Sequence, residues 1–245
     1  MLPLSVQLQQ LFSGFTFIFL LQAACSTLAL ALAGCSCGLL MGLLVACLRR
    51  SRAPYLMPLR VVLVVFVELM RRIPFLVTLF LTLFVLQALG TNLSFFNIAL
   101  IAVCLIATAY LAEIFRAGFD SVPQAQIEAA QTLNFGNLQI LFTVMLPQAW
   151  KVVLPPAFSF MVSFIKDTAL ASQLGVVELT FASKILITRG YSAFLIYSLV
   201  LLVYFALSWP LSLLGAWLEQ RTQRAFNPLA DAAPTPPSQP LLQGR

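Results

Sequence analysis

Ionisable side chains that interrupt long apolar segments are the residues of this sequence most able to do chemistry. They form three groups: Glu68 with Arg71 and Arg72, Glu113 with Arg116, and Lys166 with Asp167. A charge inside a lipid bilayer is costly, so each of these side chains needs a partner or a function. Glu113 and Arg116 are three residues apart, on one helical face, and are expected to pair. Lys166 and Asp167 point about 100° apart on a helix, so at least one is expected to face another partner.

Several kinds of chemistry are excluded by residues that are missing. The sequence contains no histidine, which removes histidine general bases, histidine metal ligands and Ser-His catalytic pairs. All five cysteines lie in apolar segments, and Cys35 and Cys37 are one residue too close for a CxxC motif. A GxxxxGK[ST] loop for nucleotide phosphates does not occur either. We therefore expect no catalytic residue, no metal site and no cofactor on this chain.

The composition indicates the elements that must position these charges. Of the 245 residues, 61% are hydrophobic and only 9% are charged, whereas a soluble domain carries roughly 25% charged residues. The apolar runs do not alternate with polar residues, as barrel strands do, so we expect membrane-spanning helices. The formal charge of +6 comes from arginines at the ends of spans, which is typical of cytoplasmic loops and not of a nucleic-acid-binding face.

Five apolar segments are long enough to cross a bilayer, which takes about 20 residues. They lie at Leu21–Leu48, Val61–Leu89, Phe95–Phe115, Val153–Val176 and Ser192–Leu218. The predicted fold class is an all-α integral membrane protein. We expect residues 1–20 to lie along the membrane interface, residues 21–218 to form the membrane domain, and the proline-rich residues 219–245 to be a disordered tail.

Arginines set the expected orientation. Arg49, Arg50, Arg52 and Arg60 follow the first span, and positively charged loops stay in the cytoplasm. With five spans the N-terminus is then external and the C-terminus cytoplasmic. The loop of residues 119–150, between the third and fourth spans, is cytoplasmic as well.

This cytoplasmic loop carries signals for a helix-turn-helix. Ser121-Val122-Pro123-Gln124 reads as a capping box for a helix over Val122–Leu133. Asn134 tolerates the left-handed conformation that ends a helix. A second short helix is expected to begin at Gly136 or Asn137 and to stop at Leu146-Pro147.

Small and apolar residues in the same loop predict contact with another protein. Ala129 and Ala130 allow close approach, and the apolar residues of the loop are expected to find too little partner surface within this chain. We interpret the loop as a plug for a groove on a partner. The alternative is an amphipathic loop that lies on lipid.

The loop resembles the EAA loop of type I ABC-importer permeases. In that pattern, E-A-A is followed after three residues by G, after nine more by I, and after one more by L-P. Glu128-Ala129-Ala130 and Leu146-Pro147 fall at this spacing, with Asn134 in place of Gly and Val144 in place of Ile. The coupling residues that the resemblance implies are Glu128, Ala129, Ala130, Leu133, Asn134, Gly136, Leu146 and Pro147.

Three further stretches extend the resemblance over about Leu21 to Leu218. They are FVELMRRIPFLV, AYLAEIFRAGFDSVPQAQIEAAQTL and LPPAFSFMVSFIKDTALASQLGVVELT, and the last two are similar to the polar amino acid branch, the histidine/glutamine-type permeases. The resemblance implies a permease subunit of the bacterial inner membrane. It also implies a second permease subunit (a copy or a different chain), an ATPase dimer that binds ATP and Mg²⁺, and an external substrate-binding protein.

An amino acid substrate would give the buried charges a function. Glu68 and Asp167 suit its ammonium group and an arginine suits its carboxylate, and two acids favour a basic amino acid among the polar ones. The residues expected along the substrate path or gate are Glu68, Arg71, Arg72, Pro74, Lys166, Asp167 and Thr168. In the alternative, Arg71 or Lys166 only neutralises these acids. The competing functions are a secondary transporter or channel subunit without an ATPase partner, and a membrane-embedded enzyme.

Overall fold

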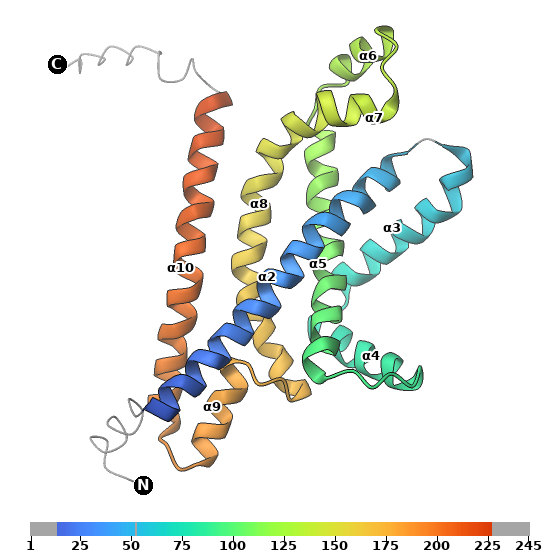
Figure 1. Ribbon diagram of the computed structural model, residues 1–245. Coiled ribbons are helices and arrows are strands. Elements are labelled where there is room, and N and C mark those ends of the chain that lie inside the picture. The colour runs from blue at the N-terminus through green and yellow to red at the C-terminus, as the bar shows by residue number, and fades with distance from the viewer. Residues whose placement is uncertain (1–13, 52, 227–245) are drawn as a thin grey trace, which may run out of the picture.

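The protein is almost entirely helical (Figure 1). A computed structural model describes residues 14–51 and 53–226, and no strand occurs within these ranges. The long helices are α2 (Gly14–Arg50), α5 (Phe95–Asp120), α8 (Leu146–Asp167) and α10 (Ala193–Phe226). The shorter helices are α3 (Met57–Arg72), α4 (Phe75–Ala88), α6 (Gln124–Thr132), α7 (Asn137–Ile140) and α9 (Leu179–Thr188). The all-α membrane fold expected from the sequence is confirmed.

Helices α2 and α5 form the closest contact of the fold. Gly38 of α2 faces Ala107 of α5 so closely that a Cβ atom on the glycine would lie 2.6 Å from the alanine Cβ. A Cβ on Gly42 would lie 2.8 Å from the backbone nitrogen of Ala112. Small residues that repeat every four positions let two membrane helices approach in this way. Helix α5 is therefore the centre of the fold, and α3, α4 and α8 also pack against it.

The outer helix α10 packs mainly on α8 and α9. Its other side exposes large apolar side chains: Leu201, Leu202, Phe205, Trp209, Leu213, Leu214 and Trp217. Backbone groups satisfied within the helix and an apolar surface are what a bilayer requires of a spanning segment.

The second expected span, Val61–Leu89, is two helices and not one, so that prediction is wrong. Helix α3 ends at Arg72, Ile73 adopts an extended conformation (φ −83°, ψ 135°), and α4 begins after Pro74. Proline has no N–H to donate, and its ring disfavours a helical conformation at the preceding residue. In the described residues, four helical stretches are long and apolar enough to cross a membrane: Gly14–Arg50, Phe95–Asp120, Asn137–Leu174 and Ala193–Arg221.

Leu146-Pro147 starts a helix where the sequence analysis expected a stop. Residues Leu141–Met145 form a π-helical turn that leads from α7 directly into α8, with Pro147 in the first turn of α8. Proline is compatible with a first helical turn, where its missing N–H is not needed. Two further prolines, Pro155 and Pro156, lie inside α8.

Other boundaries also differ from the expected ones. Helix α2 begins at Gly14 and continues through residue 21 without a break, α5 extends to Asp120, and α10 extends to Phe226. Residues 1–13 and 227–245, which include most of the expected interfacial segment and tail, lie outside the described residues. The helix α9 was not expected at all; it follows a 3-10 segment, Thr168–Leu174, that continues from α8.

Candidate functional site

The loop of residues 119–150, hereafter called the coupling segment after the role that the resemblance implies, contains α6 and α7 and stands at one end of the molecule (Figure 1). The turn between the two helices closes as the sequence predicted. Asn134 has φ of 59°, the left-handed conformation. Its N–H donates to the carbonyl of Gln131 at 2.9 Å, and the N–H of Phe135 donates to that of Ala130 at 3.1 Å. This pair of hydrogen bonds is the Schellman arrangement, which satisfies the last carbonyls of a helix.

The start of α6 differs from the predicted capping box. Because α5 continues to Asp120, Ser121 closes that helix, and its hydroxyl donates to the carbonyl of Gly118 at 2.7 Å. Pro123 occupies the N-cap position of α6. Gln124 uses its side chain to donate to Glu128 Oε1 at 3.3 Å. The predicted capping box is therefore wrong, since its serine already serves the preceding helix.

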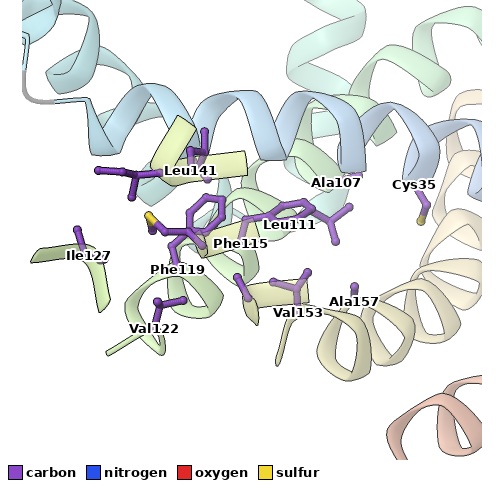
Figure 2. Close-up of a cluster of buried hydrophobic side chains, with 14 of the residues drawn as sticks. Cys35, Ala107, Leu111, Phe115, Phe119, Val122, Ile127, Leu141, Val153 and Ala157 are labelled. Carbon is purple, nitrogen blue, oxygen red and sulfur yellow. The ribbon is translucent and has the colours of Figure 1, made fainter. Parts of the chain in front are cut away.

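One face of the coupling segment is buried against its own chain (Figure 2). The buried side chains from this segment are Phe119, Val122, Ile127, Ala130, Ile140, Leu141, Met145 and Ala149. They share a core with Leu111 and Phe115 of α5 and Val153 of α8. The expectation that the apolar residues of this loop lack partners within the chain is wrong for this face, because α5 and α8 cover it.

The opposite face of the coupling segment is open to solvent or to a partner. Glu128 and Ala129 of α6 are exposed, and Leu133 is 69% exposed. Leu138 is 72% exposed and Phe142 is 60% exposed, but these two side chains lie elsewhere, in a groove that the segment forms with the end of α2. Gly136, at the N-cap of α7, and Pro147 are exposed, whereas Leu146 is half-buried. The exposed side of α6 therefore presents an acid, a small residue and an apolar side chain together, a combination that suits contact with another protein.

Charged residues gather where α2, α3 and α5 meet. Glu113 lies 2.6 Å from Arg116, 3.2 Å from Arg49 and 3.6 Å from Arg71. Its side chain is only 18% exposed. The pairing of Glu113 with Arg116 that the sequence predicted is present, and the carboxylate joins three helices as well. Asp120 continues this group by pairing with Arg50 and Arg116 at 3.2 Å and 2.5 Å.

Glu68 and Asp167 are not brought together. Glu68 pairs with Arg72 at 2.8 Å along α3, and the two side chains are 43% and 79% exposed. Neither residue lines the cavity that contains Asp167. Of the two acids expected to serve one ligand, only Asp167 lines a cavity, and its side chain lies at the open side of that cavity.

That cavity has a volume of about 370 Å³. Its walls come from the α3–α4 junction, α5 and α8, and they consist of Met70, Ile73, Phe75, Ile106, Tyr110, Ser159, Phe160, Ser163, Phe164 and Asp167. Asp167 is the charged residue of this lining, at the last position of α8. Pockets for small molecules are largely apolar with a few placed polar groups, and this one has that character.

The remaining residues expected along the substrate path lie around the cavity. Pro74 stands between two lining residues, Ile73 and Phe75, at the break between α3 and α4. Lys166 is exposed and is not part of the lining. Thr168 is fully buried, and its hydroxyl donates to the carbonyl of Ile165 at 2.7 Å. In the part of the chain that the structure describes, no three histidine, cysteine or acidic side chains are placed to hold a metal ion.

Sequence reasoning missed a buried polar junction around Glu178. Its carboxylate accepts the N–H of Phe181 at 2.8 Å, capping α9, and the hydroxyl of Tyr204 at 3.0 Å. Thr27 of α2 accepts the N–H of Leu179 at 3.2 Å. Glutamate is not one of the usual N-cap residues, so no strong local signal marked the start of α9.

Comparisons with known proteins identify relatives of this chain among transport permeases. The family model described as "Binding-protein-dependent transport system inner membrane component" matches residues 38–224. The probable glutamine ABC transporter permease protein GlnP of Bacillus subtilis (strain 168) is 37% identical over 185 residues, which cover 74% of this chain and 83% of that protein. The L-cystine transport system permease protein TcyB of the same organism is 37% identical over 188 residues, covering 76% of this chain and 79% of the relative.

Solved structures extend the comparison to the fold. A crystal structure of an amino acid ABC transporter with histidines has a TM-score of 0.76 and 30% identity, covering 84% of this chain and 94% of that one. The MetNI methionine ABC transporter in inward-facing conformations has a TM-score of 0.73. At 21% identity, over 86% of this chain and 99% of the other, the second likeness concerns the fold alone.

Proposed function

Since the chain belongs to the family of binding-protein-dependent transport system inner membrane components, within which its relatives are amino acid ABC transporter permeases, we propose that it is the membrane-spanning subunit of an ATP-driven importer of polar amino acids. It provides one half of the translocation path. A second permease subunit provides the other half, and an external binding protein delivers the substrate.

The observation that carries this proposal is the exposed face of the coupling segment. Glu128, Ala129 and Leu133 project from a helix whose other face is anchored on α5 and α8. A helix held firmly on one side and open on the other can pass a force from a partner into the membrane domain. The sequence carries no GxxxxGK[ST] loop, so an ATPase dimer supplies that force and this chain is not itself an enzyme.

The cavity supports an amino acid as substrate. A volume of about 370 Å³ is within the usual range for small-molecule sites. Asp167 would accept the substrate's ammonium group, or a cationic side chain, by charge-assisted hydrogen bonds. Ser159 and Ser163 offer hydroxyl groups to the remaining polar atoms, whereas the Tyr110 hydroxyl already donates to the Arg71 carbonyl. Glu68 and Arg72 pair with each other along α3, outside the lining of the cavity, and we do not assign them a contact with the substrate.

The orientation follows from the arginines. Arg49, Arg50, Arg71 and Arg116 gather at the end of the bundle that carries the coupling segment. Positive residues favour the cytoplasmic side, so the coupling segment meets the ATPase there. Helices α3 and α4 together return the chain between α2 and α5, so α2 begins at the end of the bundle opposite to the one where α10 ends (Figure 1). The start of α2 is then external and the end of α10 cytoplasmic, in a bacterial inner membrane.

Reconstitution tests the proposal directly. The chain is produced with its ATPase and permease partners and reconstituted into vesicles. ATP is enclosed in the vesicles, so that it reaches the complexes whose coupling segment faces the lumen. Uptake of radiolabelled glutamine, histidine, arginine and cystine is measured with and without the binding protein. We expect uptake of at least one of these that depends on ATP and on the binding protein. Uptake driven by an ion gradient in the absence of ATP would instead favour a secondary transporter.

A further inference from the structure

Arg71 connects the ion cluster around Glu113 with the wall of the cavity. Its Nη1 atom lies 3.6 Å from Glu113 Oε1. Its guanidinium carbon lies 5.9 Å from the ring centre of Tyr110, in the range of a cation–π contact. The Tyr110 hydroxyl donates to the backbone carbonyl of Arg71 at 3.4 Å. Tyr110 lines the cavity and Arg71 itself does not, although Met70 and Ile73 on either side of it do.

Glu113 does not depend on Arg71 for its hydrogen bonds. Arg116 donates to Glu113 Oε1 at 2.6 and 2.9 Å, and Arg49 donates to Oε2 at 3.2 Å. The separation of 3.6 Å from Arg71 is longer than a hydrogen bond. Glu113 is therefore held in place by Arg116 of its own helix and by Arg49 of α2, and the end of α3 is placed against it.

The end of α3 needs such a fixed point. The helix stops at Arg72 and the chain turns to an extended conformation at Ile73. The last turn of α3 is not followed by further helix, so contacts of its side chains with other helices hold it in position. Two of these contacts are made by Arg71, one to Glu113 and one to Tyr110.

Tyr110 carries this placement into the cavity wall. Its ring stacks on Phe160 with centroids 5.2 Å apart, and Phe160 stacks on Phe164 at 4.9 Å. All three rings line the cavity. A shift of Tyr110 would therefore move a continuous aromatic wall, since stacked rings of this kind pack as a unit.

We propose that Arg71 is a positioning residue for the cavity: held against Glu113, it fixes Tyr110 and the end of α3, and so sets the affinity of the cavity for an amino acid. It acts through Tyr110 and does not touch the ligand. The inference rests on the proposed function, because it takes this cavity as the transport site.

The test compares variants in the complete permease–ATPase complex, purified without the binding protein. The probes are radiolabelled L-glutamine and L-histidine, whose equilibrium Kd is measured beside the basal rate of ATP hydrolysis. For Arg71→Gln we expect a Kd roughly fivefold higher, which corresponds to about 1 kcal/mol, with an unchanged basal rate. Arg71→Lys keeps the charge near Glu113 and is expected to recover part of the affinity. Arg72→Gln is the matched control, because Arg72 is 79% exposed and pairs only along α3; its Kd is expected to stay at the wild-type value.

A second variant keeps the test independent of folding. Tyr110→Phe removes the hydroxyl that binds the Arg71 carbonyl and keeps the ring on Phe160. It is also expected to raise Kd. The double variant with Arg71→Gln is expected to raise Kd by less than the product of the two single increases, because the two residues act through one contact. If Arg71→Gln fails to assemble, Tyr110→Phe alone decides.

The outcomes separate this inference from the proposed function. Unchanged Kd in both Arg71→Gln and Tyr110→Phe overturns the positioning role while leaving an active wild-type transporter in place. A lowered rate of ATP-driven uptake with unchanged Kd also overturns the positioning role, and it assigns Arg71 to the conformational change that ATP hydrolysis drives. A wild-type complex that binds neither amino acid and shows no ATP-dependent uptake refutes the proposed function, and this inference fails with it.

Discussion

Ala129 and Ala130 are neighbours in α6 but have different surroundings: Ala130 is 5% exposed and lies in the core shared with α5 and α8, whereas Ala129 is exposed. Tryptophan at the two positions should therefore fail differently. Ala130→Trp overfills the chain's own core, which costs about 1–3 kcal/mol, so its melting temperature should fall even without an ATPase. Ala129→Trp should keep the wild-type melting temperature and lose ATPase co-purification. Normal co-purification of Ala129→Trp would remove this face from the contact with the ATPase.

The turn at Asn134 makes a second prediction. Asn134→Gly should be neutral or slightly stabilising, because glycine adopts a positive φ freely. A β-branched residue strongly resists the left-handed conformation, so Asn134→Val should destabilise the complex by roughly 1–2 kcal/mol. Thermal unfolding in detergent and ATPase co-purification measure both effects. Equal behaviour of the two variants would argue against the importance of this helix end.

Asp167 is predicted to bind the cationic group of the substrate. Asp167→Asn keeps the shape and removes the charge. Losing one charge-assisted hydrogen bond costs about 1.5–3 kcal/mol, so uptake at subsaturating substrate should fall roughly 10- to 100-fold. Glu68→Gln is the control acid, since Glu68 pairs with Arg72 away from the cavity. The role of Asp167 in binding would be refuted if both variants transported alike.

Close packing of α2 on α5 predicts a large effect at Gly42. The Cβ of Gly42→Ala would meet the backbone of Ala112 at 2.8 Å, and backbone has no room to yield. Overpacking of this kind costs about 1–3 kcal/mol. Gly14→Ala, where nothing lies within 4 Å of the new Cβ, should unfold at the wild-type temperature. A stable Gly42→Ala would mean that the two helices separate without cost.

The arginines at the end of α2 predict the orientation in the membrane. A reporter protein fused after Arg224 should be cytoplasmic, and one fused at Met1 should be external. Activity assays of a phosphatase that works only outside the cytoplasm distinguish the two. Finding both ends on one side would contradict the arrangement.

Local signals predicted the coupling segment well where backbone chemistry decides the structure. Asn134 was located as a helix end because few residues tolerate positive φ. The burial of Ile127 and Ala130 was not predictable in the same way. It depends on how α6 folds back onto the adjoining ends of α5 and α8, a tertiary contact for which the sequence carries no local signal.

The hydropathy of the second predicted span led to one helix where the structure has two. The apolar run from Val61 to Leu89 is long enough to cross a bilayer, and this length outweighed the local signal of Pro74. The proline rule, which disfavours a helical residue at Ile73, would have placed the break correctly. Length also hid α9, because ten residues are too few for a span and resembled a loop.

Helix α8 connects the coupling segment at one end with Asp167 at the other, and Pro155 and Pro156 interrupt its hydrogen bonding about midway. Because neither proline has an N–H, the carbonyls of Lys151 and Val152 lose their helical donors, and the helix bends there more easily than elsewhere. Helix α8 therefore consists of two stiff halves joined at a flexible point near Pro155 and Pro156. Under the proposed function, a push on the coupling segment would change the angle between the two halves of α8, so the end that carries Asp167 can tilt while the core around Val153 stays packed.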